Sequence, residues 1–198
     1  GGEARWDTIA WFDHRAQAEA EACTASGHRV LDFIGGTMSP EMEVPKLMWL
    51  KRHAPASWAQ SGRMFDLADF LTWKASGSNA RSACTLTCKW TYLAHEDHGW
   101  QRDFLAAVGL DDLFERAGLP ERASPIADAL GPLNAAAATT LGLTTRCIVG
   151  AGLIDAHAGA LGALAEFARD TQQLDRHLAL VAGTSSCVMA LSDAPMPT

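Results

Sequence analysis

The sequence has no run of lysine and arginine, no Cys-x-x-Cys pair and no apolar stretch near the roughly 20 residues of a membrane span. Its 23 acidic and 16 basic residues give a net charge of −7, which repels phosphate backbones and anionic lipid headgroups. Nucleic acid and membranes are therefore not expected as partners. A small anion remains an acceptable ligand, because a few amides and one or two cations suffice to bind it.

The five cysteines form no framework of pairs. They are odd in number and scattered, a pattern typical of reduced thiols in a cytoplasmic protein. Cys84 and Cys88 stand four residues apart in a predicted helix, the spacing of half a metal site, but no second pair of ligands follows. We therefore expect packing cysteines, no metal and a cytoplasmic location.

The size of the chain allows one domain and part of another. It has 198 residues, 48% of them hydrophobic, which is enough for a substantial core. It begins with Gly1 rather than methionine and stops soon after a predicted hairpin. We expect it to be part of a longer protein.

The first two thirds of the sequence predict a mostly helical structure. A β-favouring apolar run at 8–12 precedes a helix that ends at Gly27. Further helices are predicted where apolar residues recur at helical spacing between glycine and proline turns, over 41–52, 64–75, 100–108, 111–117 and 133–141.

The last third returns to alternating strands and helices. A buried strand is predicted at 146–149, a tight glycine loop at 150–152 and a helix at 155–164. Two apolar strands at 177–182 and 187–191 flank a small polar turn and predict a hairpin. The predicted fold class is α/β.

Asp155 is the candidate catalytic residue. It lies in the segment GAGLIDAHAG (150–159), where a strand gives way to a helix, and ligand crevices in α/β proteins form at such places. A helix N-terminus favours an ionised carboxylate, which can accept a proton from a substrate hydroxyl during phosphoryl transfer. The alternative is a helix N-cap without a chemical role. A dinucleotide loop is disfavoured, because Asp155 would occupy the position of its third glycine.

The turn at Gly183, Thr184 and Ser185 is the candidate phosphate-binding loop. Its amides and hydroxyls can surround phosphate oxygens, although small polar residues also make ordinary hairpin turns. Because it follows Asp155 closely, we expect both to face one cleft.

Five segments in chain order resemble the FGGY family of carbohydrate kinases. They are WFDHRA (11–16), SPEMEVPKLMWL (39–50), the group of FDLADFLTWKASG (65–77), RS (81–82) and CKW (88–90), then GAGLIDAHAG (150–159) and LVAGTSSC (180–187). The third of these, the group from 65 to 90, resembles the ribulokinase branch in particular. The likeness covers residues 8–191.

The resemblance implies functional residues. Asp155 would be the general base and would also bind the substrate, Lys89 would bind a sugar hydroxyl, Trp11 would line the sugar site, and Gly183, Thr184 and Ser185 would help to bind ATP with Mg²⁺. For Lys89 the alternative is a solvated surface lysine, and for Trp11 a buried core residue. The substrate would be a small-molecule sugar, a ketopentose such as D-ribulose.

The resemblance also implies a fold, a partial, helix-rich ribonuclease H-like lobe of the actin-like ATPase type. Residues 1–176 would form most of the N-terminal, sugar-binding lobe, and 177–198 would begin the C-terminal, ATP-binding lobe. Segments of both nucleotide-binding parts are absent from the sequence, so we expect this chain by itself to be inactive. The oligomeric state stays open, a homodimer included.

Three other functions remain as alternatives. The chain could be a non-catalytic sugar-binding module, or part of a kinase for xylulose, ribitol or glycerol. A metal-dependent hydrolase would use His95, His98, Asp155 and His157, although a solvated loop explains His95 and His98 more simply.

Overall fold

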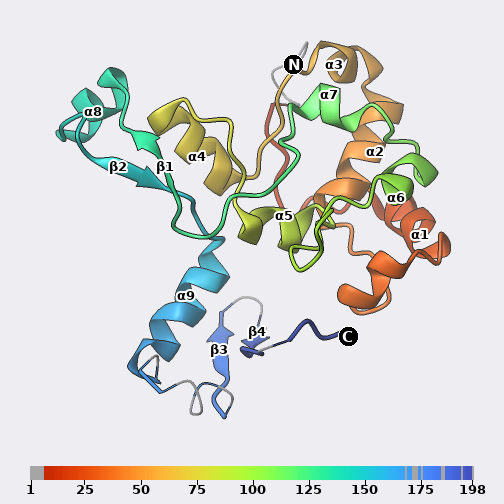
Figure 1. Ribbon diagram of the computed structural model, residues 1–198. Coiled ribbons are helices and arrows are strands. Elements are labelled where there is room, and N and C mark those ends of the chain that lie inside the picture. The colour runs from red at the N-terminus through yellow and green to blue at the C-terminus, as the bar shows by residue number, and fades with distance from the viewer. Residues whose placement is uncertain are drawn as a thin grey trace. The chain divides into compact units, whose positions relative to one another are not determined.

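The structure is a computed structural model that describes residues 7–167, 169–170, 174, 176–183, 186–192 and 194–197. The described chain forms two compact units, one that ends at Gly152 and one that extends from Leu153 to Met196. Figure 1 shows their elements, and each unit is treated separately below.

The first unit is mainly helical. Its elements, in chain order, are α1 (Gln17–Ala25), η2 (Arg29–Phe33), α2 (Glu43–His53), α3 (Pro55–Gln60), α4 (Leu67–Ser76), α5 (Ala83–Lys89), α6 (Arg102–Ala107), α7 (Leu113–Ala117), β1 (Ala129–Pro132), α8 (Ala135–Leu141) and β2 (Ile148–Gly150). The seven helices predicted in this part, including the one that carries Cys84 and Cys88, are confirmed, with ends shifted by a few residues.

Helix ends follow from local sequence. The side chain of Asp66 accepts a hydrogen bond from the backbone N–H of Ala68 at the start of α4, and Gly77 ends that helix with φ of 82°. Asn134 caps α8 in the same way by accepting from the N–H of Ala137 at 2.9 Å. Such caps satisfy backbone groups that have no partner within the helix. A left-handed residue after the last turn suits glycine, which has no Cβ.

A single hydrophobic core joins most helices of the first unit. Helix α2 contributes Val44, Leu47, Met48 and Leu50 to it, and α1 and α3 pack against α2. Among its least exposed side chains are Val30, Val44, Leu86, Phe104, Leu110 and Leu113. Burial of this apolar surface supplies the main favourable term in folding.

A two-stranded antiparallel sheet lies beside α4 and α8. In it Pro132 pairs with Ile148 and Gly131 with Val149, and α4 contacts both strands (Figure 1). The predicted strand at 146–149 is confirmed in position, but its predicted burial is wrong, because the Ile148 side chain is 61% exposed. The sequence analysis missed β1, a strand of only four residues that contains Gly131 and Pro132.

The predicted strand at 8–12 is wrong. Residues 8–10 have no regular structure, and Trp11 and Phe12 form a turn. The carbonyl oxygens of Ala10 and Trp11 bind the side chain of Lys46 instead of a neighbouring strand. An apolar β-favouring run becomes a strand only where a partner strand accepts its backbone hydrogen bonds.

The second unit contains α9 (Asp155–Leu164), η3 (Ala165–Phe167), β3 (Ala179–Ala182) and β4 (Ser186–Met189). The predicted helix and hairpin are confirmed, and α9 packs against β3. A small core of Ala160, Leu164 and Ala179 holds them together, with Phe167, Leu174 and Met189 packed against it.

Candidate functional site

The segment that carries Trp11 is held by a lysine from α2. The Nζ of Lys46 donates hydrogen bonds to the carbonyl oxygens of Ala10 at 2.6 Å and of Trp11 at 3.0 Å. The Trp11 ring is 54% exposed and lies edge-on to Phe12, with ring centroids 5.7 Å apart. The alternative of a buried core tryptophan is therefore wrong, and the indole is available to a ligand.

The charge of Lys89 acts on two carboxyl groups that were not among the predicted site residues. Lys89 is the last residue of α5, Glu43 the first of α2 and Asp66 the N-cap of α4, and all three are half-buried. Burial raises the pKa of Glu43 to about 8, and Asp66 adds to this, while the cations of Lys89 and Lys46 act against it. Burial likewise raises the pKa of Asp66.

This group is called the Glu43 cluster below and consists of Glu43, Lys46, Asp66 and Lys89. It gathers residues from three helices, and Lys46 links it to the Trp11 segment. Lys46 binds the Trp11 segment, and its charge also acts on Glu43. The signal that could have found Glu43 and Asp66 is an acid placed where an apolar helix begins.

Asp155 is the first residue of α9 and is exposed to solvent. Ile154 occupies the N-cap position, and no side chain caps the helix, so the alternative of an N-cap aspartate is wrong. One carboxylate oxygen, Oδ1, accepts a hydrogen bond from the N–H of Ala156 at 2.8 Å. The carboxylate is therefore at a helix N-terminus and accessible, as a general base must be, and its catalytic role stays a prediction.

Gly152, in the glycine loop before Asp155, is held by a hydrogen bond within the first unit. Ser82 is fully buried, and its hydroxyl donates to the carbonyl oxygen of Gly152 at 2.6 Å. Asp69 holds Ser82 in turn, because its Oδ1 accepts from the backbone N–H of Ser82 at 2.9 Å and its Oδ2 from the Thr85 hydroxyl at 2.6 Å. These bonds anchor the loop three residues before Asp155.

Gly183, in the predicted phosphate loop, directly follows β3 and is exposed. Thr184 and Ser185 lie outside the described residues. Since α9 packs on β3, the helix of Asp155 and the strand before the turn belong to one packed unit. The shared cleft itself stays a prediction.

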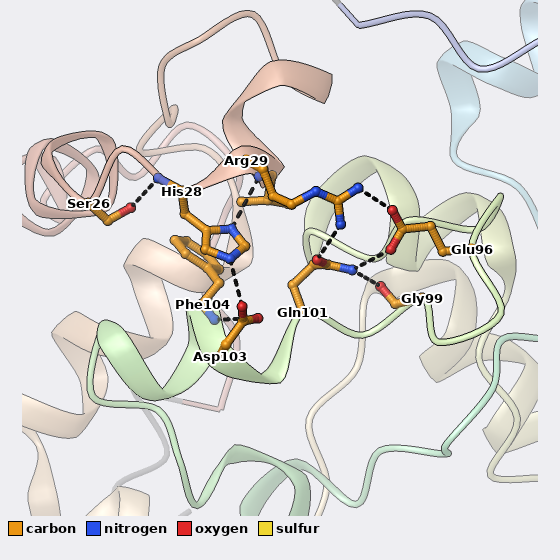
Figure 2. Close-up of polar contacts among 9 residues, drawn as sticks. Ser26, His28, Arg29, Glu96, Gly99, Gln101, Asp103 and Phe104 are labelled. Atoms are coloured by element: carbon orange, nitrogen blue, oxygen red, sulfur yellow. Dashed lines mark hydrogen bonds and ion pairs between the residues drawn. The ribbon is translucent and has the colours of Figure 1, made fainter.

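Side chains of the loop around His95 contact other parts of the first unit. Arg29 is paired with Glu96, and Gln101 joins them by accepting from Arg29 at 3.2 Å and donating to Glu96 at 3.0 Å (Figure 2). His95 packs its ring against Phe33, with centroids 4.9 Å apart. Glu96 is thus engaged with a guanidinium and His95 with an aromatic ring, contacts that give this loop a structural role.

Arg81, part of the segments that resemble ribulokinases, is a buried structural residue. Its guanidinium lies over the ring of Phe65 at 3.7 Å and donates to the carbonyl oxygens of Asn79 and Met64. Burial lowers the pKa of Arg81 to about 10. These contacts give Arg81 a structural role in the packing of the first unit.

The family model for the N-terminal domain of the FGGY family of carbohydrate kinases matches residues 6–162. This match covers most of the sequence. The chain belongs to the FGGY family. The resemblance drawn from the sequence is therefore confirmed.

Curated relatives agree with the family assignment. This FGGY chain is 47% identical over 201 residues to an FGGY carbohydrate kinase domain-containing protein of Danio rerio, a match that covers 96% of the chain and 36% of that protein. It is 39% identical to a D-ribulokinase of Saccharomyces cerevisiae, over 95% of the chain and 30% of the yeast protein. The FGGY chain thus spans about a third of the length of the curated relatives it matches.

Solved structures support the fold. A crystal structure of gluconate kinase from Lactobacillus acidophilus aligns with a TM-score of 0.72 at 17% identity, over 91% of this chain and 34% of that one. At this sequence identity, the similarity is evidence for the fold and not for the function. The predicted fold class, a partial, helix-rich α/β lobe of the actin-like ATPase type, is confirmed for the FGGY chain.

None of the described helices of this FGGY chain is both long enough and apolar enough to cross a bilayer.

Proposed function

We propose that the whole protein transfers a phosphoryl group from MgATP to a hydroxyl of a small sugar, a ketopentose such as D-ribulose. The observation that carries the proposal is the family match together with an exposed Asp155 at the N-terminus of α9. Identity to a D-ribulokinase favours a pentulose among the sugars. Because the chain spans a third of its relatives, activity belongs to the whole protein.

Asp155 would accept the proton of the attacking hydroxyl. Phosphoryl transfer needs a group that orients the nucleophile and receives its proton as the bond to phosphorus forms. The positive end of a helix dipole favours a negative group at this position, and a carboxylate can accept the proton. The exposure of Asp155 supports this role, since a base must reach its substrate.

Lys89 and Trp11 would bind the sugar. The ammonium group of Lys89 can donate to sugar oxygens, and the exposed indole of Trp11 can pack on the C–H face of a polyol. Support for Trp11 comes from its exposed ring, and support for Lys89 comes from its place in the segment that resembles ribulokinases. Gly183, with Thr184 and Ser185, would contact the ATP phosphates, and Gly183 is exposed as that role requires.

The experiment is Asp155→Asn in the whole protein, assayed with MgATP and D-ribulose. We expect kcat to fall on the order of 10²–10⁴-fold, the usual contribution of a positioned proton acceptor, with sugar affinity retained. Glu166→Gln is a matched control, because Glu166 is an exposed acid in the same unit. Near-normal turnover of Asp155→Asn would reject the assignment.

A substrate panel completes the test. D-ribulose, L-ribulose, xylulose, ribitol and glycerol are each assayed with MgATP and with the wild-type protein. The highest kcat/KM identifies the substrate. Absence of phosphorylation for every member would reject the proposed sugar kinase activity.

A further inference from the structure

Two thiols lie close together on α5. Cys84 and Cys88 are four residues apart in this helix, and their Sγ atoms are within 4.8 Å of each other. Cys84 is buried, whereas Cys88 is half-buried and follows the exposed Thr87. The sequence predicted packing for these cysteines, but two neighbouring thiols, one of them on a partly exposed residue, can also be oxidised to a disulfide.

A disulfide between these residues does not fit an undistorted helix. The Cβ atoms of helical residues four positions apart are about 5–6 Å from each other. A disulfide brings its two Cβ atoms to about 3.5–4.5 Å. Formation of the bond therefore pulls one turn of α5 out of helical geometry. The resulting strain makes the bond readily reducible, as regulatory disulfides are.

The first turn of α5 is fixed, so the last turn is the part that moves. The hydroxyl oxygen of Ser82 accepts a hydrogen bond from the N–H of Cys84 at 3.1 Å. Ser82 is held in turn by the buried Asp69, whose Oδ1 accepts from its backbone N–H at 2.9 Å. The last turn carries Cys88 and Lys89, both half-buried. Movement of Cys88 toward Cys84 therefore displaces its neighbour Lys89.

We propose that Cys84 and Cys88 form a reversible disulfide, and that this bond weakens sugar binding by displacing Lys89. The effect on sugar binding rests on the proposed function, in which Lys89 binds a sugar hydroxyl, whereas formation of the disulfide does not. The oxidant is a small-molecule disulfide of the class of oxidised glutathione.

The reaction consists of two thiol–disulfide exchanges. The Cys88 thiolate attacks one sulfur of oxidised glutathione, the sulfur–sulfur bond of the oxidant breaks, and one glutathione leaves as a thiolate. The Cys84 sulfur then displaces the second glutathione, and the bond between Cys84 and Cys88 forms. The two cysteine protons pass to the two released glutathione thiolates. The protein thus loses two electrons, and the oxidant gains them.

A packing role without redox chemistry makes a different prediction. The hydrogen bond with Cys84 and burial both raise the pKa of Cys88, so its thiolate is scarce and exchange should be slow at neutral pH. If packing were the whole role of the pair, the oxidant would leave both thiols unchanged in the folded protein. The state of the two sulfur atoms after treatment therefore separates the two explanations.

Peptide mapping of the whole protein tests the disulfide. Trypsin cleaves after Arg81 and Lys89, so both cysteines lie in the single peptide 82–89. The protein is treated with oxidised glutathione, checked for folding by circular dichroism, then alkylated in urea and digested without reductant. We expect the peptide to carry no alkyl group and to have lost two hydrogen atoms, and dithiothreitol should restore both alkylation sites. Two alkylated cysteines after treatment of the folded protein would overturn the proposal.

Two variants test the order of the exchanges. Cys84→Ala should retain one glutathione on Cys88, because no second sulfur displaces it, and an unmodified Cys88 in the folded variant would contradict the reaction. Cys88→Ser should form no link within the peptide. Two thiolates are also half of a zinc site. Zinc that co-purifies with the wild type and is lost from Cys88→Ser would assign the pair to a metal and reject the disulfide.

Cys147→Ser is the matched control. Cys147 is a half-buried thiol of the same unit, like Cys88, and lies outside the peptide 82–89. The variant should form the link between Cys84 and Cys88 as the wild type does. Absence of the link in folded Cys147→Ser would show that the oxidation depends on another cysteine and would reject the pair as the site.

Kinetics with D-ribulose and MgATP test the effect on Lys89. Loss of one hydrogen bond from a charged group should raise the sugar KM of the oxidised wild type on the order of 10-fold, with the KM for ATP unchanged. Dithiothreitol should reverse the change, and Cys88→Ser should keep its sugar KM in the presence of the oxidant. An unchanged sugar KM after complete linkage would reject the effect on Lys89.

The two measurements also distinguish failure of this proposal from failure of the proposed function. Mapping requires no activity, so a wild type that phosphorylates no sugar rejects the kinase activity, while a link in the peptide 82–89 still supports the disulfide. A wild type that phosphorylates the sugar and forms no link retains the proposed function and rejects the disulfide.

Discussion

The hydroxyl of Ser82 donates a hydrogen bond of 2.6 Å to the carbonyl oxygen of Gly152, across 70 residues of sequence. Ser82 also caps α5 by accepting from the N–H of Cys84 at 3.1 Å. One buried side chain thus starts a helix and fixes the loop that leads to Asp155. We predict that Ser82 acts as a positioning residue in the proposed enzyme, through the loop that ends before Asp155.

Ser82→Ala should destabilise the chain by about 1–3 kcal/mol, because it removes the cap and leaves the Gly152 carbonyl without this donor. Urea unfolding measures the effect. In the whole protein kcat should fall several-fold, with the sugar KM unchanged, because Asp155 loses its fixed approach.

Ser76→Ala is the control for Ser82. Its hydroxyl donates to the Thr72 carbonyl within the same helix at 2.8 Å, and we expect its removal to cost less than about 0.5 kcal/mol. Equal destabilisation by the two variants would contradict the anchoring role of Ser82.

Stability should fall with rising pH through the titration of Glu43. Its folded pKa of about 8 lies above the ordinary value of 4.5, so its contribution is fully present below pH 4.5 and is lost as the pH rises through 8. One pKa unit corresponds to about 1.4 kcal/mol, so the loss is on the order of a few kcal/mol. Glu43→Gln removes the titrating group and should be the more stable protein at pH 9.

Urea unfolding at pH 5, 7 and 9 compares the wild type with Glu43→Gln. The difference between their free energies of unfolding should shift toward the variant as the pH increases. A difference that stays constant from pH 5 to pH 9 would show that the Glu43 carboxyl is not buried as described.

The polar network of Figure 2 should depend strongly on Gln101. Gln101 is buried, accepts from Arg29, and donates to Glu96 and to the carbonyl oxygen of Gly99. Gln101→Leu should cost about 1–3 kcal/mol, because it leaves polar groups without partners. Thermal or urea unfolding measures this loss.

Arg102→Met is the control for the network. Arg102 forms an ion pair with Glu121 at 2.7 Å, but both side chains are more than half exposed. Exposed pairs contribute about 0–1 kcal/mol, so Arg102→Met should have the smaller effect. The opposite order would contradict the role given to Gln101.

Local sequence was sufficient for most elements of the fold. The helix at 155–164 and the hairpin after it were predicted from apolar spacing, glycine and small polar residues, because these act within a few positions of each other. The apolar run at 8–12 shows where prediction from local sequence fails. Its composition favours a strand, but pairing depends on a distant segment, and Lys46 binds its carbonyl groups instead.

Some residues of the candidate site were predicted from the sequence, and others were found only in the structure. Asp155, Lys89 and Trp11 were selected from the sequence and its resemblance to a family, and the structure corrected two of the alternatives by exposing Trp11 and by placing Asp155 after the N-cap. Glu43 was not selected. Its unusual carboxyl depends on burial, which no spacing of residues reveals.

The residues alone were enough to identify the family, most of the helices and the acid at the start of α9, because short segments carry that information. Which side chains meet depends on the packing of distant segments. The bond from Ser82 to Gly152 and the cluster of Glu43 with Lys89 join residues 70 and 46 positions apart. Such contacts arise when helices pack on a common core, and their chemistry then depends on how far that packing excludes water.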